Sequence, residues 1–131
     1  MTASAELRYT PAHHWVKKEA DGTVTVGITF HAQEALGDIV FVQIPEPGRR
    51  FKQAEACGLI ESVKTAADLY APVSGEVIAV NAQAADKPEQ MNTDPYGTWL
   101  FRLRPEQPSE IDALLDAAAY RKIADSEPGG L

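Results

Sequence analysis

Short apolar runs alternate with turn residues along most of the chain, and this pattern is typical of a mainly β protein. The run Thr-Val-Thr-Val-Gly-Ile over 23–28 alternates with a period of two, which predicts a strand with one apolar face. The Asp21-Gly22 pair before it predicts a two-residue hairpin turn with positive φ at both positions. Further strands are expected over 15–18, 38–44, 51–61, 69–73, 76–80 and 98–103.

One short helix is expected inside the β body, over residues 29–36. Thr29 can accept a hydrogen bond from the first turn of this helix. Gly37 can adopt the left-handed backbone conformation that ends many helices.

A second helix is expected near the C-terminus, over 109–123. Ser109 and Asp112 have the spacing of a capping box, and apolar residues recur one helical turn apart after them. We therefore expect an amphipathic helix that packs on the β body, followed by a frayed tail over 125–131.

An internal sequence repeat divides the β region into two parts. Gly-Asp-Ile-Val-Phe-Val over 37–42 resembles Gly-Glu-Val-Ile-Ala-Val over 75–80, at an offset of 75 − 37 = 38 residues. A weaker match relates 58–60 to 97–100, at an offset near 39–40. The repeat predicts two quasi-symmetric halves packed as a flattened β sandwich or barrel, with 61–69 as the junction between them.

Length and composition indicate one globular domain over 1–131, with its core at 8–104. The formal net charge of −7 argues against a nucleic-acid or anionic-membrane partner, since both are polyanions. One cysteine, no signal-peptide pattern and no long apolar run lead us to expect a cytoplasmic protein.

Candidate chemistry lies at the junction, where Glu61-Ser62-Val63-Lys64 precedes a second apolar run. Lys64 is expected at the tip of a turn, where its amine is accessible to a modifying enzyme. An exposed lysine is common in any protein, so the turn alone does not establish a modification site.

The sequence around this turn resembles the H proteins of the glycine cleavage system, and the matching motifs extend from Arg8 to Trp99. The motifs are Arg8-Tyr9-Thr10, His13-His14-Trp15-Val16, Val26-Gly27-Ile28-Thr29, Ala32-Gln33, Leu36-Gly37-Asp38-Ile39-Val40, Glu61-Ser62-Val63-Lys64, Ala71-Pro72-Val73-Ser74-Gly75-Glu76-Val77, Val80-Asn81, Pro88, Asn92, Asp94-Pro95-Tyr96-Gly97 and Trp99.

This resemblance implies a lipoyl/biotinyl-like barrel-sandwich hybrid and a carrier protein without catalytic activity. Lys64 would carry lipoic acid in amide linkage. This lipoyl-lysine side chain, the arm, would take the aminomethyl group of glycine from the pyridoxal-phosphate-dependent glycine decarboxylase to the aminomethyl transferase, which uses tetrahydrofolate. Dihydrolipoyl dehydrogenase would then reoxidise the arm. A lipoate ligase or a lipoyl/octanoyl transferase would attach it, and we expect the carrier to be a monomer.

The residues flanking Lys64 have two open interpretations. Glu61 and Asp68 are either solvated loop acids or contacts that the lipoylating enzyme recognises together with Ser62 and Val63.

Two departures from the family pattern lie where the loaded arm is thought to rest on its carrier. His14 stands where the family usually has Glu, and Ala67 where it commonly has Ser. A third departure is the shorter Gly97-Thr98-Trp99 segment. These changes leave open an H-like carrier that relays lipoyl or octanoyl groups to other proteins.

Other classes fit the sequence less well. Biotinyl domains and the lipoyl domains of 2-oxo-acid dehydrogenases have Met-Lys-Met or Asp-Lys-Ala around the lysine, which this chain lacks. Cys57 lies in an apolar run and is expected to be buried and inert. His13, His14 and His31 do not have a metal-binding spacing, so no metal site and no catalytic residue is predicted.

Overall fold

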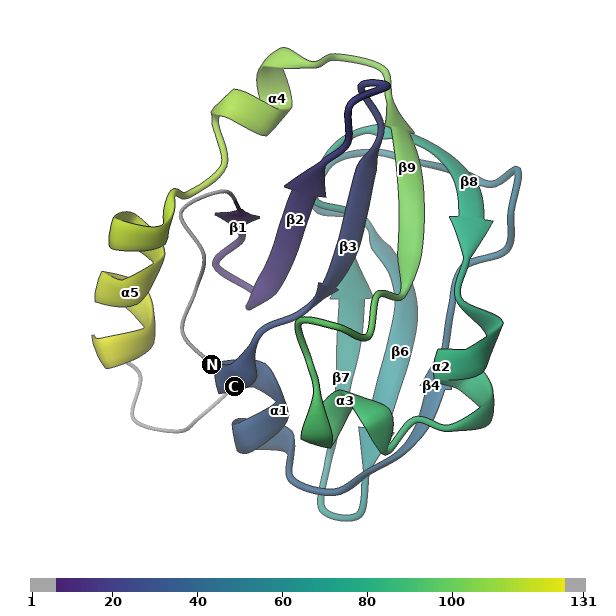
Figure 1. The fold of residues 1–131 in the computed structure, drawn as a ribbon, viewed down its shortest axis with the longest axis vertical. Coiled ribbons are helices and arrows are strands. Elements are labelled where there is room, and N and C mark those ends of the chain that lie inside the picture. The colour runs from purple at the N-terminus through teal and green to yellow at the C-terminus, as the bar shows by residue number, and fades with distance from the viewer. Residues whose placement is uncertain (1–6, 127–131) are drawn as a thin grey trace.

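The computed structural model describes residues 7–126, which form two β-sheets and five short helices (Figure 1). The strands are β1 Arg8–Tyr9, β2 His14–Lys18, β3 Val24–Ile28, β4 Ile39–Gln43, β5 Arg50–Phe51, β6 Ala56–Ser62, β7 Ala66–Tyr70, β8 Gly75–Val80 and β9 Phe101–Pro105. The helices are α1 Phe30–Leu36, α2 Ala82–Asp86, α3 Gln90–Thr93, α4 Ser109–Asp112 and α5 Ala117–Ser126.

The two sheets have the strand orders β1-β2-β3-β9-β8-β5 and β4-β6-β7, with every neighbouring pair antiparallel. Apolar side chains from both sheets meet in one core, for example Val26, Val77 and Leu103 from the larger sheet and Ile60 and Leu69 from the smaller. Burial of these side chains is the main favourable term for the fold. The prediction of a mainly β protein is therefore confirmed.

The two halves predicted from the internal sequence repeat are visible in the strand pairing. β4 pairs with β6 and β8 pairs with β9, and each pair contains one β-bulge. The first bulge lies between Ile39 and Phe41, and the second between Val77 and Ala79, which is the same position shifted by 77 − 39 = 38 residues. The partner strands β6 and β9 are related by a different offset. Phe41 pairs with Glu61, and the equivalent residue Ala79 pairs with Arg102, so the offset is 102 − 61 = 41 residues. The expected value of 39–40 is thus wrong, whereas the repeat itself is real.

The β2–β3 turn differs from its prediction. Only Gly22 has positive φ, at 89°, and the N–H of Glu19 donates to the carbonyl of Thr23 over 2.8 Å. Three residues therefore form the loop, which is a common alternative to the two-residue hairpin turn. The expected single strand over 51–61 is likewise divided, into β5 and β6, by a turn at 52–55.

Helix α1 has the predicted position and N-cap, since the Thr29 side chain accepts a hydrogen bond from the N–H of Ala32. Gly37 follows the helix with positive φ, 79°, but its ψ of −150° lies outside the left-handed helical region, so the predicted form of the helix end is wrong. This helix covers one end of the space between the sheets, where the β6–β7 hairpin tip also lies (Figure 1).

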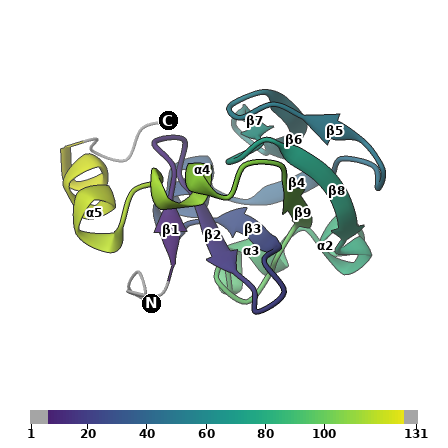
Figure 2. The same ribbon diagram turned by 90° about the horizontal axis from the view of Figure 1, so that it is seen from above.

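The C-terminal helix expected over 109–123 is two helices, α4 and α5, and the expected continuity is wrong. Leu115 forms two backbone hydrogen bonds with Tyr9 (2.8 and 2.9 Å), and this bridge interrupts the helix. The N-cap of α4 is Pro108, without a side-chain hydrogen bond, so the capping box predicted at Ser109 does not form. α5 lies at one side of the β body (Figure 2) and extends through 125–126; residues 127–131 lie outside the described part of the chain.

Candidate functional site

The β6–β7 hairpin ends in a tight turn with Val63 and Lys64 at its tip. The N–H of Ser62 donates to the carbonyl of Thr65 over 2.8 Å. The Ser62 hydroxyl accepts from the N–H groups of Lys64 (3.3 Å) and Thr65 (3.1 Å), as is typical of serine in turns. Neither tip residue has positive φ, so this turn requires no glycine. Lys64 is exposed, as its sequence context predicts.

The turn is supported by the segment that joins α1 to β4. The N–H of Val63 donates to the carbonyl of Asp38 over 3.0 Å. The Cε of Lys64 would lie 3.4 Å from a Cβ at Gly37, so the lysine stem passes over this glycine. A larger residue at Gly37 would crowd the stem and would also be strained by the positive φ.

The side chain of Asn92 holds the segment that joins α1 to β4. Its side-chain oxygen accepts from the N–H of Ile39 (2.9 Å), and its amide donates to the carbonyl of Gly37 (2.7 Å) and to Gln33 (3.2 Å). The prediction of helices did not include α3, which carries Asn92, because four residues give little periodic signal.

The other residues singled out by the sequence surround the turn. Glu61 pairs with Ala66, and Asp68 with Leu59, so both acidic side chains are on the same face of the smaller sheet, and both are exposed. Val63 is 71% exposed at the tip. Exposed Val40 and Phe41 of β4 lie on the strand that neighbours β6.

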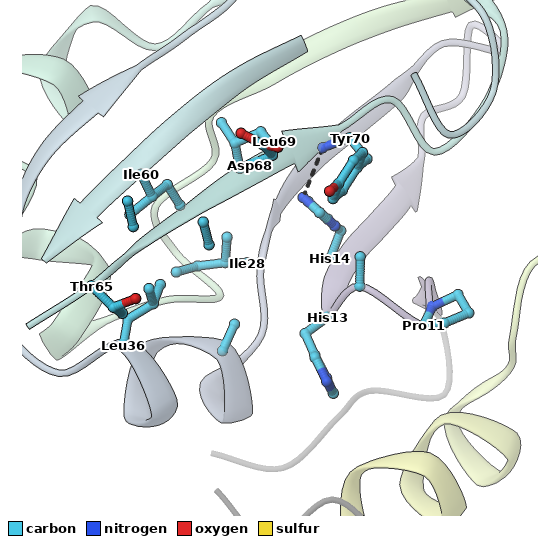
Figure 3. A pocket seen from close by; sticks show the side chains of 14 residues that line it. Pro11, His13, His14, Ile28, Leu36, Ile60, Thr65, Asp68, Leu69 and Tyr70 are labelled. Carbon is cyan, nitrogen blue, oxygen red and sulfur yellow. Dashed lines mark hydrogen bonds between the residues drawn. The ribbon is translucent and has the colours of Figure 1, made fainter. Parts of the chain in front are cut away.

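Beside the hairpin is a cavity of about 420 Å³, which is within the range of about 300–1,000 Å³ typical of small-molecule pockets. Its walls are β7, helix α1 and the start of β2 (Figure 3). The lining is mixed, and it includes two of the three departures from the family pattern, His14 and Ala67. The lining residues are Pro11, Ala12, His13, His14, Ile28, Ala32, Leu36, Ile60, Thr65, Ala66, Ala67, Asp68, Leu69 and Tyr70.

His14 and His13 are both buried in the cavity wall, each with 2% exposure. The Nε2 of His14 accepts a hydrogen bond from the backbone N–H of Tyr70 (3.4 Å), and its Nδ1 lies 3.3 Å from the Thr10 hydroxyl. Burial, and to a smaller extent the neighbouring His13, lowers the pKa of His14 to about 4. The ring is therefore neutral at physiological pH, and the cavity wall has no charge at this position.

His13 points away from His14, toward the C-terminal helix (Figure 3). Its Nδ1 lies 2.8 Å from the hydroxyl of Tyr120, which also lies 2.7 Å from the hydroxyl of Thr29. The Tyr120 hydroxyl thereby joins α5 to the N-cap of α1. The sequence gives no direct signal for this contact, because it joins residues more than ninety positions apart.

The remaining candidates have structural explanations. Cys57 is half-buried at a β-bulge, and burial together with nearby Glu55 raises the pKa of its thiol to about 12, so the thiol is unreactive. Within residues 7–126, no three His, Cys, Asp or Glu side chains are grouped as a metal site. In that same range, no helix has the length and apolar character to cross a membrane.

Comparison with known proteins gives the same family along nearly the whole chain. Residues 7–127 match the family model described as "Glycine cleavage H-protein". The chain is 58% identical over 127 residues to the "Glycine cleavage system H protein" of Nitrosomonas europaea, covering 97% of this chain and 98% of that protein. It is also 58% identical over 119 residues to "Glycine cleavage system H protein 2" of Pseudomonas putida, covering 91% and 94%.

The fold agrees with a solved structure of the same family. The crystal structure of a glycine cleavage system H protein from Mycobacterium marinum superposes with a TM-score of 0.83 at 44% identity, covering 92% of this chain and 97% of that chain. The quasi-symmetric β body, the exposed lysine turn and the comparisons agree, and the chain belongs to the glycine cleavage H-protein family.

Proposed function

We propose that this chain is the lipoyl carrier of the glycine cleavage system, with the arm attached to Lys64. The observation that carries the proposal is the position of Lys64, exposed at the tip of a hairpin that is hydrogen-bonded within itself and to the α1–β4 segment. A modifying enzyme must enclose the lysine amine in its own active site, and a protruding tip on a rigid support allows this. Glu61, Ser62, Val63 and Asp68 would form the surface that this enzyme recognises.

The residues around Lys64 fit a lipoyl group. The lysine stem passes Gly37, directly after Leu36, which lines the cavity. The cavity has apolar walls for a hydrocarbon chain and polar groups at Thr65 and Asp68. When bound, lipoic acid supplies a dithiolane that is reduced as it accepts the aminomethyl group and is reoxidised afterwards.

The protein contributes position rather than reaction chemistry. A tether keeps its end at a high effective concentration near the carrier surface, which shortens the search between one enzyme and the next. The lipoyl arm and the cofactors of the partner enzymes supply the reaction chemistry, so we propose no catalytic residue in this chain.

The partners follow from the glycine cleavage system: glycine decarboxylase, the aminomethyl transferase and dihydrolipoyl dehydrogenase. A lipoate ligase or a lipoyl/octanoyl transferase would load the arm onto a monomeric carrier. With a single cysteine and an acidic composition, we place the carrier in the cytoplasm. The alternative of a relay carrier is not favoured, because the curated relatives are named for glycine cleavage.

Intact-mass analysis tests the attachment site. The chain is produced in a lipoate-sufficient host beside Lys64→Arg and the matched control Lys52→Arg, which alters another exposed lysine. We expect wild type and the control to gain the mass of one lipoyl group and Lys64→Arg to gain none. Absence of the added mass from wild type, or its presence on Lys64→Arg, would refute the assignment.

A further inference from the structure

A second cavity lies on the outer face of the larger sheet. It has a volume of about 380 Å³ and shares no lining residue with the cavity beside Lys64. This volume is within the range of about 300–1,000 Å³ typical of small-molecule pockets. The proposed carrier function gives this second cavity no role.

Strands β2, β3 and β9 lie side by side and form the floor of the cavity (Figure 1). Lys17 pairs with Thr25, and Thr25 pairs with Arg102, so these three side chains form a row on one face of the sheet. The alternate residues Val26 and Phe101 pair with each other and belong to the buried core. The row therefore faces outward.

Aromatic side chains form the walls of the cavity. Trp15 comes from β2, and Tyr96 and Trp99 come from the segment between α3 and β9. The Trp15 Nε1 donates to the carbonyl of Pro95 over 3.0 Å and so holds this segment against the sheet. Tyr96 and Trp99 are half-buried, so part of each ring is free to contact a flat apolar group.

The guanidinium of Arg102 includes a donor that has no acceptor. Its Nε is buried and has no hydrogen-bond partner within residues 7–126, whereas its Nη2 donates to the Thr23 hydroxyl over 3.0 Å. The carboxylate of nearby Asp21 accepts instead from the hydroxyl and the N–H of Thr23. An unpaired buried donor costs free energy, and a ligand carboxylate at Nε would remove this cost.

The cavity contains charges of both signs. Lys17 and Arg102 are its cations and Glu19 is its anion. In the described part of the chain no ion pair joins any two of them. Glu19 accepts from the Thr25 hydroxyl over 2.6 Å, which holds its carboxylate at the end of the row. Separate positive and negative groups in one cavity match a ligand that carries both charges.

We propose that this cavity binds a free α-amino acid with an aromatic side chain. The ligand carboxylate accepts from the Arg102 Nε and is attracted by Lys17, and the ligand ammonium donates to Glu19. The ligand ring lies against Trp99. This site goes beyond the carrier function and does not involve Lys64.

The balance of charges favours this ligand class over others. A simple carboxylate would satisfy Arg102 but would bring a second anion near Glu19. A simple cation would satisfy Glu19 but would be repelled by Arg102 and Lys17. Glycine has both charges but no side chain to cover the aromatic walls.

Titration of the ¹⁵N-labelled full chain with L-phenylalanine, followed by NMR, tests the site. We expect shifts of the Trp99 indole N–H and the Arg102 Nε–H signals, with a Kd on the order of 1 mM. Phenylalaninamide lacks the carboxylate, N-acetyl-phenylalanine lacks the ammonium, and glycine lacks the ring. Each of these analogues should bind about fivefold more weakly or worse.

Two variants and a matched control assign the charged groups. Arg102→Gln should weaken phenylalanine binding about tenfold. The control Arg104→Gln should leave it unchanged, because Arg104 contacts Glu76 and does not line the cavity. Glu19→Gln should weaken the binding of phenylalanine but not that of N-acetyl-phenylalanine, which has no ammonium.

Several outcomes would overturn the proposal. Unshifted Trp99 and Arg102 signals at the solubility limit of phenylalanine would exclude the site. Equal affinity for phenylalanine and its amide, or unchanged binding to Arg102→Gln, would exclude the role of the guanidinium. Equal affinity for N-acetyl-phenylalanine would refute the amino-acid assignment in favour of a simple carboxylate. If Arg102→Gln does not fold, the analogue series on the wild-type chain decides the question.

Discussion

His14 forms part of the wall of the cavity beside Lys64. It is buried, it accepts from the N–H of Tyr70, and it stands where the family usually has a carboxylate. The neutral ring accepts this hydrogen bond without adding charge to the cavity.

The lowered pKa of His14 predicts a pH-dependent stability. The unfolded chain binds a proton at His14 near the ordinary pKa of 6.5, whereas the folded chain does so only near 4. Stability is therefore fully present above pH 6.5 and declines as the pH falls toward 4, by about 3 kcal/mol in total.

Comparison with His14→Gln largely isolates this effect, because titrating groups that do not interact with His14 contribute equally to both proteins. Urea unfolding at several pH values should show the free-energy difference, wild type minus variant, decreasing by about 3 kcal/mol between pH 7 and pH 4. A difference that does not change with pH would contradict the neutral, buried state of His14.

At the scale of elements, the site depends on a series of short supports rather than on one long element. Asn92 of α3 holds the α1–β4 segment, and the carbonyl of Asp38 in that segment holds the hairpin at Val63. Each step is a backbone or amide hydrogen bond, so the position of Lys64 does not depend on the identity of exposed side chains.

Replacement of Asn92 by leucine should release the hairpin tip. The change leaves the Ile39 N–H and the Gly37 carbonyl without their partner, which should cost about 2–3 kcal/mol in urea unfolding. Exchange of the Val63 N–H should accelerate about tenfold or more because its acceptor, Asp38, becomes mobile.

Asn81→Leu is the matched control. Asn81 caps α2 and donates to the carbonyl of Trp99, so its loss should also destabilise the fold but leave Val63 protected. Equal acceleration at Val63 in both variants would show that the hairpin responds to general destabilisation, not to Asn92.

Local patterns predicted local elements well. Thr29 and Gly37 mark the two ends of α1, and the alternating run over 23–28 coincides with β3. The predicted single apolar face of β3 was too simple, since the Trp15 ring covers Gly27 on the other face. Contacts between distant residues, such as the Leu115–Tyr9 bridge that interrupts the C-terminal helix, leave no local pattern and were missed for that reason.

For the candidate site, the sequence predicted the lysine and its turn but not the cavity. A turn is determined by neighbouring residues, whereas the cavity joins β2, α1 and β7, which only the tertiary fold brings together. His14 and Ala67 indicated its location only through the departures from the family pattern. Asn92 was named only as part of the family motifs, because its bonds to Ile39 and Gly37 depend on the tertiary fold.

At the scale of the whole molecule, two similar halves build the β body that carries Lys64 at a hairpin tip. The bulges at equivalent positions of β4 and β8 show that the repeat is structural. The formal net charge of −7 disfavours association with polyanions. A carrier component of the glycine cleavage system works by presenting its arm to the enzymes of that system.

The most direct test of this account is the exchange of the carboxyl carbon of glycine with labelled bicarbonate, catalysed by glycine decarboxylase. We predict that the lipoylated chain supports this exchange and that Lys64→Arg, handled identically, gives only the rate measured without any carrier. Exchange at the wild-type rate with Lys64→Arg, or no exchange with the lipoylated wild-type chain, would contradict the account.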